Sequence, residues 1–109
     1  MLLAVCLAVN LSAQAPAKLQ ELESRAISLK SKGDAAGALA VYQEAAILTP
    51  QLARLQDEIG FLLVVLNRQA EAVEHFNRAI ELDPKFASAH YHLGVVRWLE
   101  KGLFRGICG

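Results

Sequence analysis

Apolar residues recur along this chain at intervals of three and four, the spacing of one face of an α-helix, and no stretch alternates as a strand does. The pattern is interrupted at Lys30–Asp34, Pro50, Asn67 and Pro84. Gly and Asn accept the left-handed backbone that ends a helix, and proline cannot continue its hydrogen-bond ladder. Short loops make consecutive helices antiparallel. The predicted helices cover about residues 19–30, 35–48, 53–66, 70–82 and 87–100, with at most a stub of a sixth after them.

The helical pattern itself repeats at a spacing of 34 residues. Small residues, an aromatic residue and a proline return at the same offsets, where helices must approach closely or stop. An internal period of this length is typical of stacked helical units, each covering its neighbour. The matched positions are Ala26 with Gly60 and Gly94, Ala38 with Ala72, Tyr42 with Phe76, Ala45 with Ala79, Leu48 with Leu82, and Pro50 with Pro84.

This arrangement resembles the tetratricopeptide repeat (TPR), a helix-turn-helix unit of that length. The resemblance covers two full repeats, about 19–52 and 53–86, and an incomplete third at 87–109. It implies an all-α fold in which antiparallel helix pairs stack as a short right-handed solenoid. The first repeat has Leu22 and Arg25 where the family usually has a large aromatic and a leucine. The signature positions are Ala26, Ala38, Tyr42, Ala45, Pro50, Gly60, Ala72, Phe76, Ala79, Pro84, Leu93 and Gly94.

The resemblance also implies a binding surface, because the first helices of such repeats line a groove that holds a peptide or a partner helix. Glu23 and Phe61 replace two residues with which some members hold a terminal carboxylate, so a hydrophobic segment suits this groove better. The alternative is that its apolar residues pack under a further repeat. The expected partner-binding residues are Glu23, Ile27, Arg54, Asp57, Phe61, Val64, Tyr91, Val95 and Trp98, with Gln20, Lys30, Val65, Ser88 and Leu99 on the same faces.

Residues 1–17 carry no charged side chain, and their apolar part, Leu2 to Leu11, suits the core of a secretory signal. Its length of about ten residues is too short to span a bilayer. Cleavage after Ala13 or after Ala15 would fit the small residues there. Because no basic residue precedes the apolar core, a membrane anchor over residues 1–11 and a buried N-terminal helix are the alternatives. We expect export to the periplasm or outside the cell, and a repeat domain at 18–109.

Composition and spacing argue against several classes of site. Acidic and basic residues balance at 11 each, so no global field favours nucleic acid. His90 and His92 are two apart and point to different sides of a helix, so we expect no metal site. Cys108 lies beside glycines near the end, with nothing to hold it against a base. No glycine-rich phosphate loop is present. We therefore expect neither catalysis nor a cofactor.

Individual polar residues receive structural interpretations instead. His90 is expected to pack in place of the family's aromatic, and His92 to face solvent or the groove. Asp57 and Glu58 are adjacent in sequence, point apart, and are expected to be solvated.

The sequence therefore predicts a non-catalytic protein–protein interaction module of an exported repeat protein. Its partner would be a peptide or helix of another protein, or further repeats, and Trp98 and Leu99 would stand uncovered at the open end. The alternative is the N-terminal arm of a larger exported enzyme or of a membrane-associated assembly factor.

Overall fold

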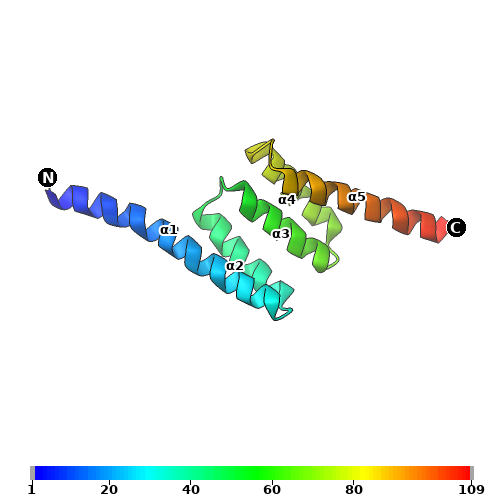
Figure 1. The fold of residues 1–109 in the computed structure, drawn as a ribbon, viewed down its shortest axis with the longest axis horizontal. Coiled ribbons are helices and arrows are strands. Elements are labelled where there is room, and N and C mark those ends of the chain that lie inside the picture. Colours follow the sequence, from blue (N-terminus) through cyan, green and yellow to red (C-terminus); the bar gives the residue numbers. More distant parts are fainter. Residues whose placement is uncertain (1, 109) are drawn as a thin grey trace. The chain divides into compact units, whose positions relative to one another are not determined.

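The computed structural model describes the backbone of residues 2–108 and the side chains of residues 17–102, and within that part all regular structure is α-helical. The predicted all-α class is thereby confirmed. The chain divides into two units, Met1–Pro50 and Gln51–Gly109. Figure 1 shows the helices α1 (Leu2–Ser31), α2 (Ala35–Leu48), α3 (Ala53–Val65), α4 (Gln69–Leu82) and α5 (Ala87–Cys108).

The first unit is a hairpin of α1 and α2 (Figure 1). Leu22 and Ala26 are the buried residues of α1 among its described side chains, and Ala38, Tyr42 and Ala45 are buried on α2. Four of these five are signature positions of the repeat, so the small and aromatic residues do lie where the helices meet. Alanine at these positions lets two backbones approach without opening a void.

Both helix turns use the residues expected of them. Gly33 has φ 82° after α1, and Asn67 has φ 62° between α3 and α4. Left-handed backbone costs most residues about 1–2 kcal/mol, a penalty that Gly avoids and Asn tolerates. Asp34 then caps α2, since its carboxylate accepts a hydrogen bond of 2.8 Å from the backbone N–H of Gly37. The predicted interruptions of the helical pattern at Lys30–Asp34 and at Asn67 are thereby confirmed.

The second unit begins with the hairpin of α3 and α4, in which Gly60 lies against the ring of Phe76. A Cβ atom added there would lie 2.5 Å from Cε1 of Phe76. The Phe76 ring is fully buried, so it has no room to move away. Gly60 weakens its helix by about 1 kcal/mol relative to Ala, and the close seating of the aromatic ring offsets that cost. The prediction that Gly60 admits the partner helix is confirmed.

α5 extends this unit by packing on α4 and α3. Three alanines that are fully or almost fully buried, Ala53, Ala79 and Ala89, form a cluster between these helices. Partly buried apolar side chains close it at the end of α4, namely Ile80, Leu82 and Phe86. Pro84 follows the cap residue Asp83, as expected of a proline that ends a helix.

Two predicted boundaries are wrong. α1 begins at Leu2 rather than near Leu19, and α5 continues to Cys108 rather than ending at Glu100. The predicted stub of a sixth helix is therefore the last part of α5. Gly102 does not interrupt it, because its backbone does not take the positive φ that ends a helix at Gly33.

The proposed signal segment, Cys6 and Cys108 have side chains outside the described residues, so export stays a prediction. Within the part of the chain that the structure describes, no helix is both long and apolar enough to cross a membrane.

Candidate functional site

The site is built from the repetition of α3 in α5. Residues 34 apart on the two helices are buried alike: Leu55, Ile59 and Leu62 are buried on α3, as are their counterparts Ala89, Leu93 and Val96 on α5. Side chains on the neighbouring stripe of each helix are only partly covered. We call this stripe the α3/α5 face, and it consists of Phe61, Val64, Val65, Tyr91, Val95 and Trp98.

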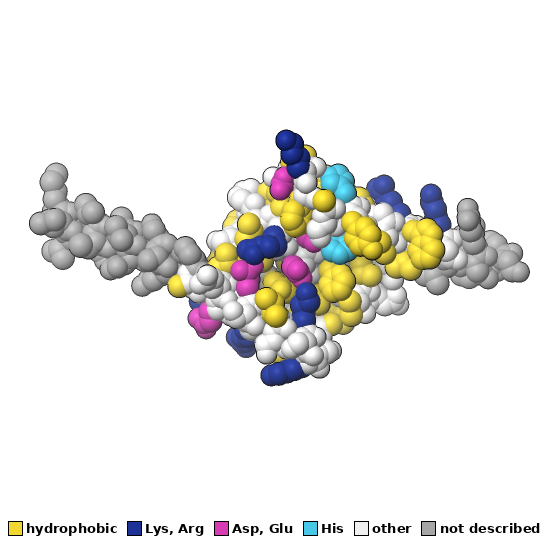
Figure 2. All heavy atoms as spheres, in the orientation of Figure 1, with side chains coloured by type: hydrophobic (Ala, Val, Ile, Leu, Met, Phe, Trp, Pro, Cys, Tyr) yellow, Lys and Arg dark blue, Asp and Glu magenta, His cyan; other side chains and the backbone are white. Residues whose placement is uncertain are grey.

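The α3/α5 face is apolar and well exposed. Tyr91 and Trp98 are each 70% exposed, Val65 is 57% exposed and Phe61 is 37% exposed. Figure 2 shows hydrophobic side chains gathered beside a histidine over α3 and α5. Five of the nine expected partner-binding residues lie on this face, and Arg54 is an exposed residue of the same helix α3.

Asp57 does not face solvent as expected. It is 4% exposed and is the buried charged residue of the described part of the chain. Its Oδ2 accepts a hydrogen bond of 2.7 Å from the hydroxyl of Ser88, and its Oδ1 lies 2.8 Å from Nδ1 of His92. A carboxylate oxygen accepts, so Nδ1 of His92 donates. The prediction of a solvated Asp57 is wrong because two donors on α5 replace the water that burial removes.

His92 also links the core to the exposed face through its ring. The centroid of its imidazole lies 5.4 Å from that of Phe76, which is buried, and 5.6 Å from those of Phe61 and Tyr91. These distances are within the range of favourable aromatic contacts. Of the two positions expected for His92, solvent or groove, the structure places it beside the groove-facing aromatics, with its side chain 24% exposed.

The Asp57–Ser88–His92 cluster has the residue types of a nucleophilic site but not the geometry of one. A general base must take the proton of the serine hydroxyl, with the carboxylate on the other ring nitrogen. Here Ser88 donates directly to Asp57, and its Oγ lies 3.4 Å from the same Nδ1 that faces Asp57. The hydroxyl proton therefore points to the carboxylate. The cluster holds α5 against α3 and does not activate a nucleophile.

The other two histidines, His90 and His75, also form hydrogen bonds within the fold. The prediction that His90 packs in place of the family's aromatic is wrong: His90 is exposed, and its Nε2 donates to the carbonyl of Pro84 at 2.9 Å. It therefore fixes the loop before α5. Residues 17–102 contain no group of three His, Cys, Asp or Glu side chains that could hold a metal ion.

His75 lies on α4, where its Nδ1 is 2.8 Å from Oε1 of Gln56 on α3. Burial lowers the pKa of His75 below its ordinary 6.5, while the nearby Glu74 and Glu71 act in the opposite direction. The neutral imidazole is therefore the form that the fold favours.

This shift gives stability a pH dependence with a definite sign. Between the lowered pKa of the folded state and 6.5, the unfolded chain binds more protons at His75, so the free energy of unfolding falls as pH is lowered through 6.5. In His75→Gln, which keeps a donor for Gln56, the urea midpoint should lose less between pH 7.5 and pH 5 than in the unmodified chain. Equal losses in the two proteins would contradict this account of His75.

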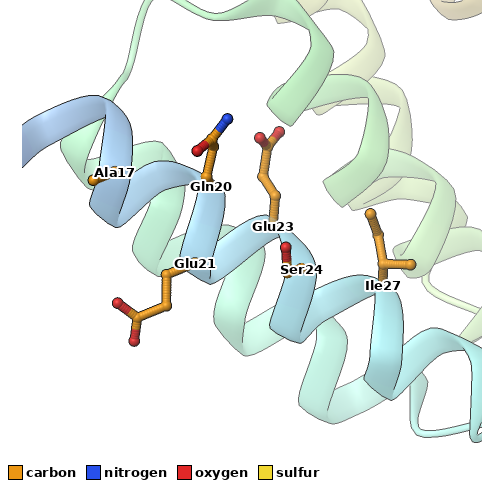
Figure 3. A pocket seen from close by; sticks show the side chains of 6 residues that line it. All are labelled: Ala17, Gln20, Glu21, Glu23, Ser24 and Ile27. Carbon is orange, nitrogen blue, oxygen red and sulfur yellow. The ribbon is translucent and has the colours of Figure 1, made fainter.

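The remaining expected residues, Glu23 and Ile27, lie on α1 in the first unit. Ile27 is 59% exposed and Glu23 is half-buried. Figure 3 shows both beside a hollow along α1. Its lining is mainly polar and comes from Ala17, Gln20, Glu21, Glu23, Ser24 and Ile27.

The sequence analysis does not predict the hydrogen bond between Asp57 and Ser88, although the sequence contains a signal for it. Asp57 and Ser88 were placed on the same groove-lining faces, where a buried carboxylate and a hydroxyl from adjacent helices can pair. The sequence alone does not reveal that α5 covers Asp57, so it does not predict that these two residues pair.

The fold and site together define an all-α helical-repeat protein with an apolar face formed by equivalent helices. Residues 60–99 match the family model of the TPR repeat, which supports an assignment to the tetratricopeptide-repeat family. The match confirms the resemblance drawn from the 34-residue spacing. Comparison with curated proteins gives no match. TPR domains typically bind proteins and are generally not catalytic.

Proposed function

We propose that the second unit binds an apolar segment of another protein on its α3/α5 face, as a peptide or an amphipathic helix. The observation that carries this proposal is the exposure of Tyr91 and Trp98, 70% each, beside Phe61 and Val65. Contiguous apolar patches on a protein surface commonly mark interaction sites, and Tyr and Trp are the residues most often enriched in binding hot spots.

Pre-organisation of this face supports the proposal. The hydrogen bonds of Asp57 to Ser88 and His92 fix α5 against α3, and the ring of His92 contacts those of Phe61 and Tyr91. A surface held in place before binding loses little conformational entropy when the partner arrives. The network therefore suits a docking surface whose aromatic side chains come from two helices.

The first unit carries the equivalent positions of its own repeat. Glu23 and Ile27 are the counterparts, 34 residues earlier, of Asp57 and Phe61. Ile27 offers a second exposed apolar side chain, 59% accessible, at the position of Phe61. We propose that Ile27 makes apolar contacts with a partner of the first unit.

A displayed library of peptide segments, both extended and helical, would test the proposal. The chain has one tryptophan, so Trp98 fluorescence reports directly on occupation of the face. Peptides enriched by the unmodified chain should bind Phe61→Ser and Val65→Ser at least about tenfold more weakly, a loss of about 1.4 kcal/mol. Ile47→Ser is the matched control, because Ile47 is 80% exposed on α2 outside the face. Peptides that bind all four proteins equally would exclude this face as the site.

A further inference from the structure

α5 exposes a surface whose equivalent on α3 is buried. The 34-residue spacing maps one stripe of α3 onto α5, and on α3 that stripe is covered by the other helices of the unit. On α5 the same stripe is exposed. The buried residues of α3 are Ala53, Asp57, Gly60 and Leu63, and their exposed counterparts on α5 are Ala87, Tyr91, Gly94 and Arg97.

The centre of this stripe is a seat for a large side chain. At Gly60 the absence of a Cβ lets the Phe76 ring of α4 reach the backbone. At Gly94 an added Cβ would have no atom within 4 Å among its described surroundings. A glycine inside a helix lowers helix stability by about 1 kcal/mol relative to alanine. On α3 the packing of the Phe76 ring against Gly60 offsets that cost, whereas on α5 the space beside Gly94 is open.

The two edges of the stripe differ in chemistry. At about 100° per residue, Tyr91 and Trp98 lie on one side of Gly94, and Arg97 and Lys101 lie on or toward the other. Arg97 replaces Leu63 of α3, so the stripe gains positive charge where α3 is apolar. Neither Arg97 nor Lys101 forms an ion pair with the described residues 17–102. Figure 2 shows basic side chains beside apolar ones along this helix.

We propose that this α5 outer face, made of Tyr91, Gly94, Arg97, Trp98 and Lys101, binds an acidic amphipathic helix of another protein. The helix occupies on α5 the place that α4 occupies on α3, with a large apolar side chain seated over Gly94. Its apolar stripe contacts Tyr91 and Trp98, and its carboxylates face Arg97 and Lys101. Two observations carry the assignment: continuity with the Gly60–Phe76 interface and the charge of the open edge.

The α5 outer face is distinct from the α3/α5 face, although Tyr91 and Trp98 lie on their common edge. Occupation of the outer face depends on Gly94 and Arg97, whereas the α3/α5 face depends on Phe61 and Val65. Substitutions at these two pairs therefore separate the two binding events.

The probe for the outer face is a stapled helical peptide with the sequence of α4, residues 69–82, carrying Arg78→Glu to make it more acidic. It contains no tryptophan, so Trp98 of the full chain reports its binding. We expect saturable binding that weakens as salt is raised. A peptide that also carries Phe76→Ala should bind at least about tenfold more weakly, because the seated side chain is gone.

Variants of the chain provide the decisive comparison. Gly94→Leu should weaken binding of the peptide at least about tenfold, and Arg97→Glu combined with Lys101→Glu should do so by a similar factor. Phe61→Ser should change it less than about twofold, since Phe61 lies outside the outer face. Gly94→Ala shows that substitutions here preserve the fold, because alanine is the better helix former and the added Cβ has open space. Its melting temperature should rise.

Three results would overturn the proposal. Unchanged binding by Gly94→Leu would place the peptide elsewhere. The double charge reversal could have no effect at any salt concentration, which would remove the acidic partner. The chain could also associate with itself through this face, shown by a concentration-dependent mass that Gly94→Leu abolishes, which would make a second copy the occupant.

Discussion

Phe76→Ala should lower the free energy of unfolding by about 3–5 kcal/mol, the largest effect expected of any single truncation in this chain. Phe76 is fully buried, seats on Gly60, and contacts the ring of His92, so its removal leaves a cavity between α3, α4 and α5. Natural domains are typically stable by about 5–15 kcal/mol, so much of the total would be lost. Urea unfolding followed by circular dichroism measures the change. Phe61→Ala is the control, because Phe61 is 37% exposed and should cost clearly less.

A double-mutant cycle tests whether the close packing of the Phe76 ring against Gly60 contributes to this loss of stability. In the unmodified chain Gly60→Ala pushes a Cβ against the Phe76 ring at 2.5 Å, and overpacking of this kind costs about 1–3 kcal/mol. In the Phe76→Ala background the same substitution should stabilise, since space is open and alanine favours the helix. The effect of Gly60→Ala should thus change sign. An equal effect in both backgrounds would contradict the close contact.

Asp57→Ala should lower stability by about 2–3 kcal/mol, because it leaves the Ser88 hydroxyl and Nδ1 of His92 without their acceptor. Ser88→Ala removes a donor to the carboxylate and should cost about 1 kcal/mol. Glu81→Ala is the matched control: Glu81 is exposed, lies 3.9 Å from Arg78, and should cost less than about 1 kcal/mol. The urea midpoints of the three variants rank their losses of stability.

Asp57→Ala should also weaken peptide binding on the α3/α5 face. Asp57 holds α5 in place, so its loss frees Tyr91 and Trp98 from their fixed position without changing either side chain. If Asp57→Ala lowers the free energy of unfolding no more than Glu81→Ala does, the Asp57 carboxylate does not hold α5 against α3.

The helices of the repeats were predictable because their signals are local. Asp34, Gly33 and Asn67 act on the backbone beside them, so residue type alone indicates where helices begin and end. The pairing of Gly60 with Phe76 was predictable for a different reason. The 34-residue period shows which helix each small residue must meet, and the family match at residues 60–99 agrees with that register.

The misjudged residues depend on which helix covers them. Asp57 looks solvated beside Glu58 until α5 is placed over it, and His90 looks like a packing residue until its ring is seen to face the carbonyl of Pro84. The end of α5 predicted at Glu100 is wrong, because a glycine can either end a helix or continue it. Gly102 has the backbone of a continuing helix, and a single sequence does not distinguish the two cases.

The way the helices pack has a consequence for the kinetics of folding. α1 meets α2, α3 meets α4, and α4 meets α5, so most packing partners are neighbours in sequence. Contacts of this kind close only short loops, and proteins rich in them fold in microseconds to milliseconds. The chain divides at Pro50, close to a repeat boundary, so either hairpin could form a folding nucleus. If binding to the proposed partner is slow, the slow step would then be association of the two molecules rather than folding of this chain.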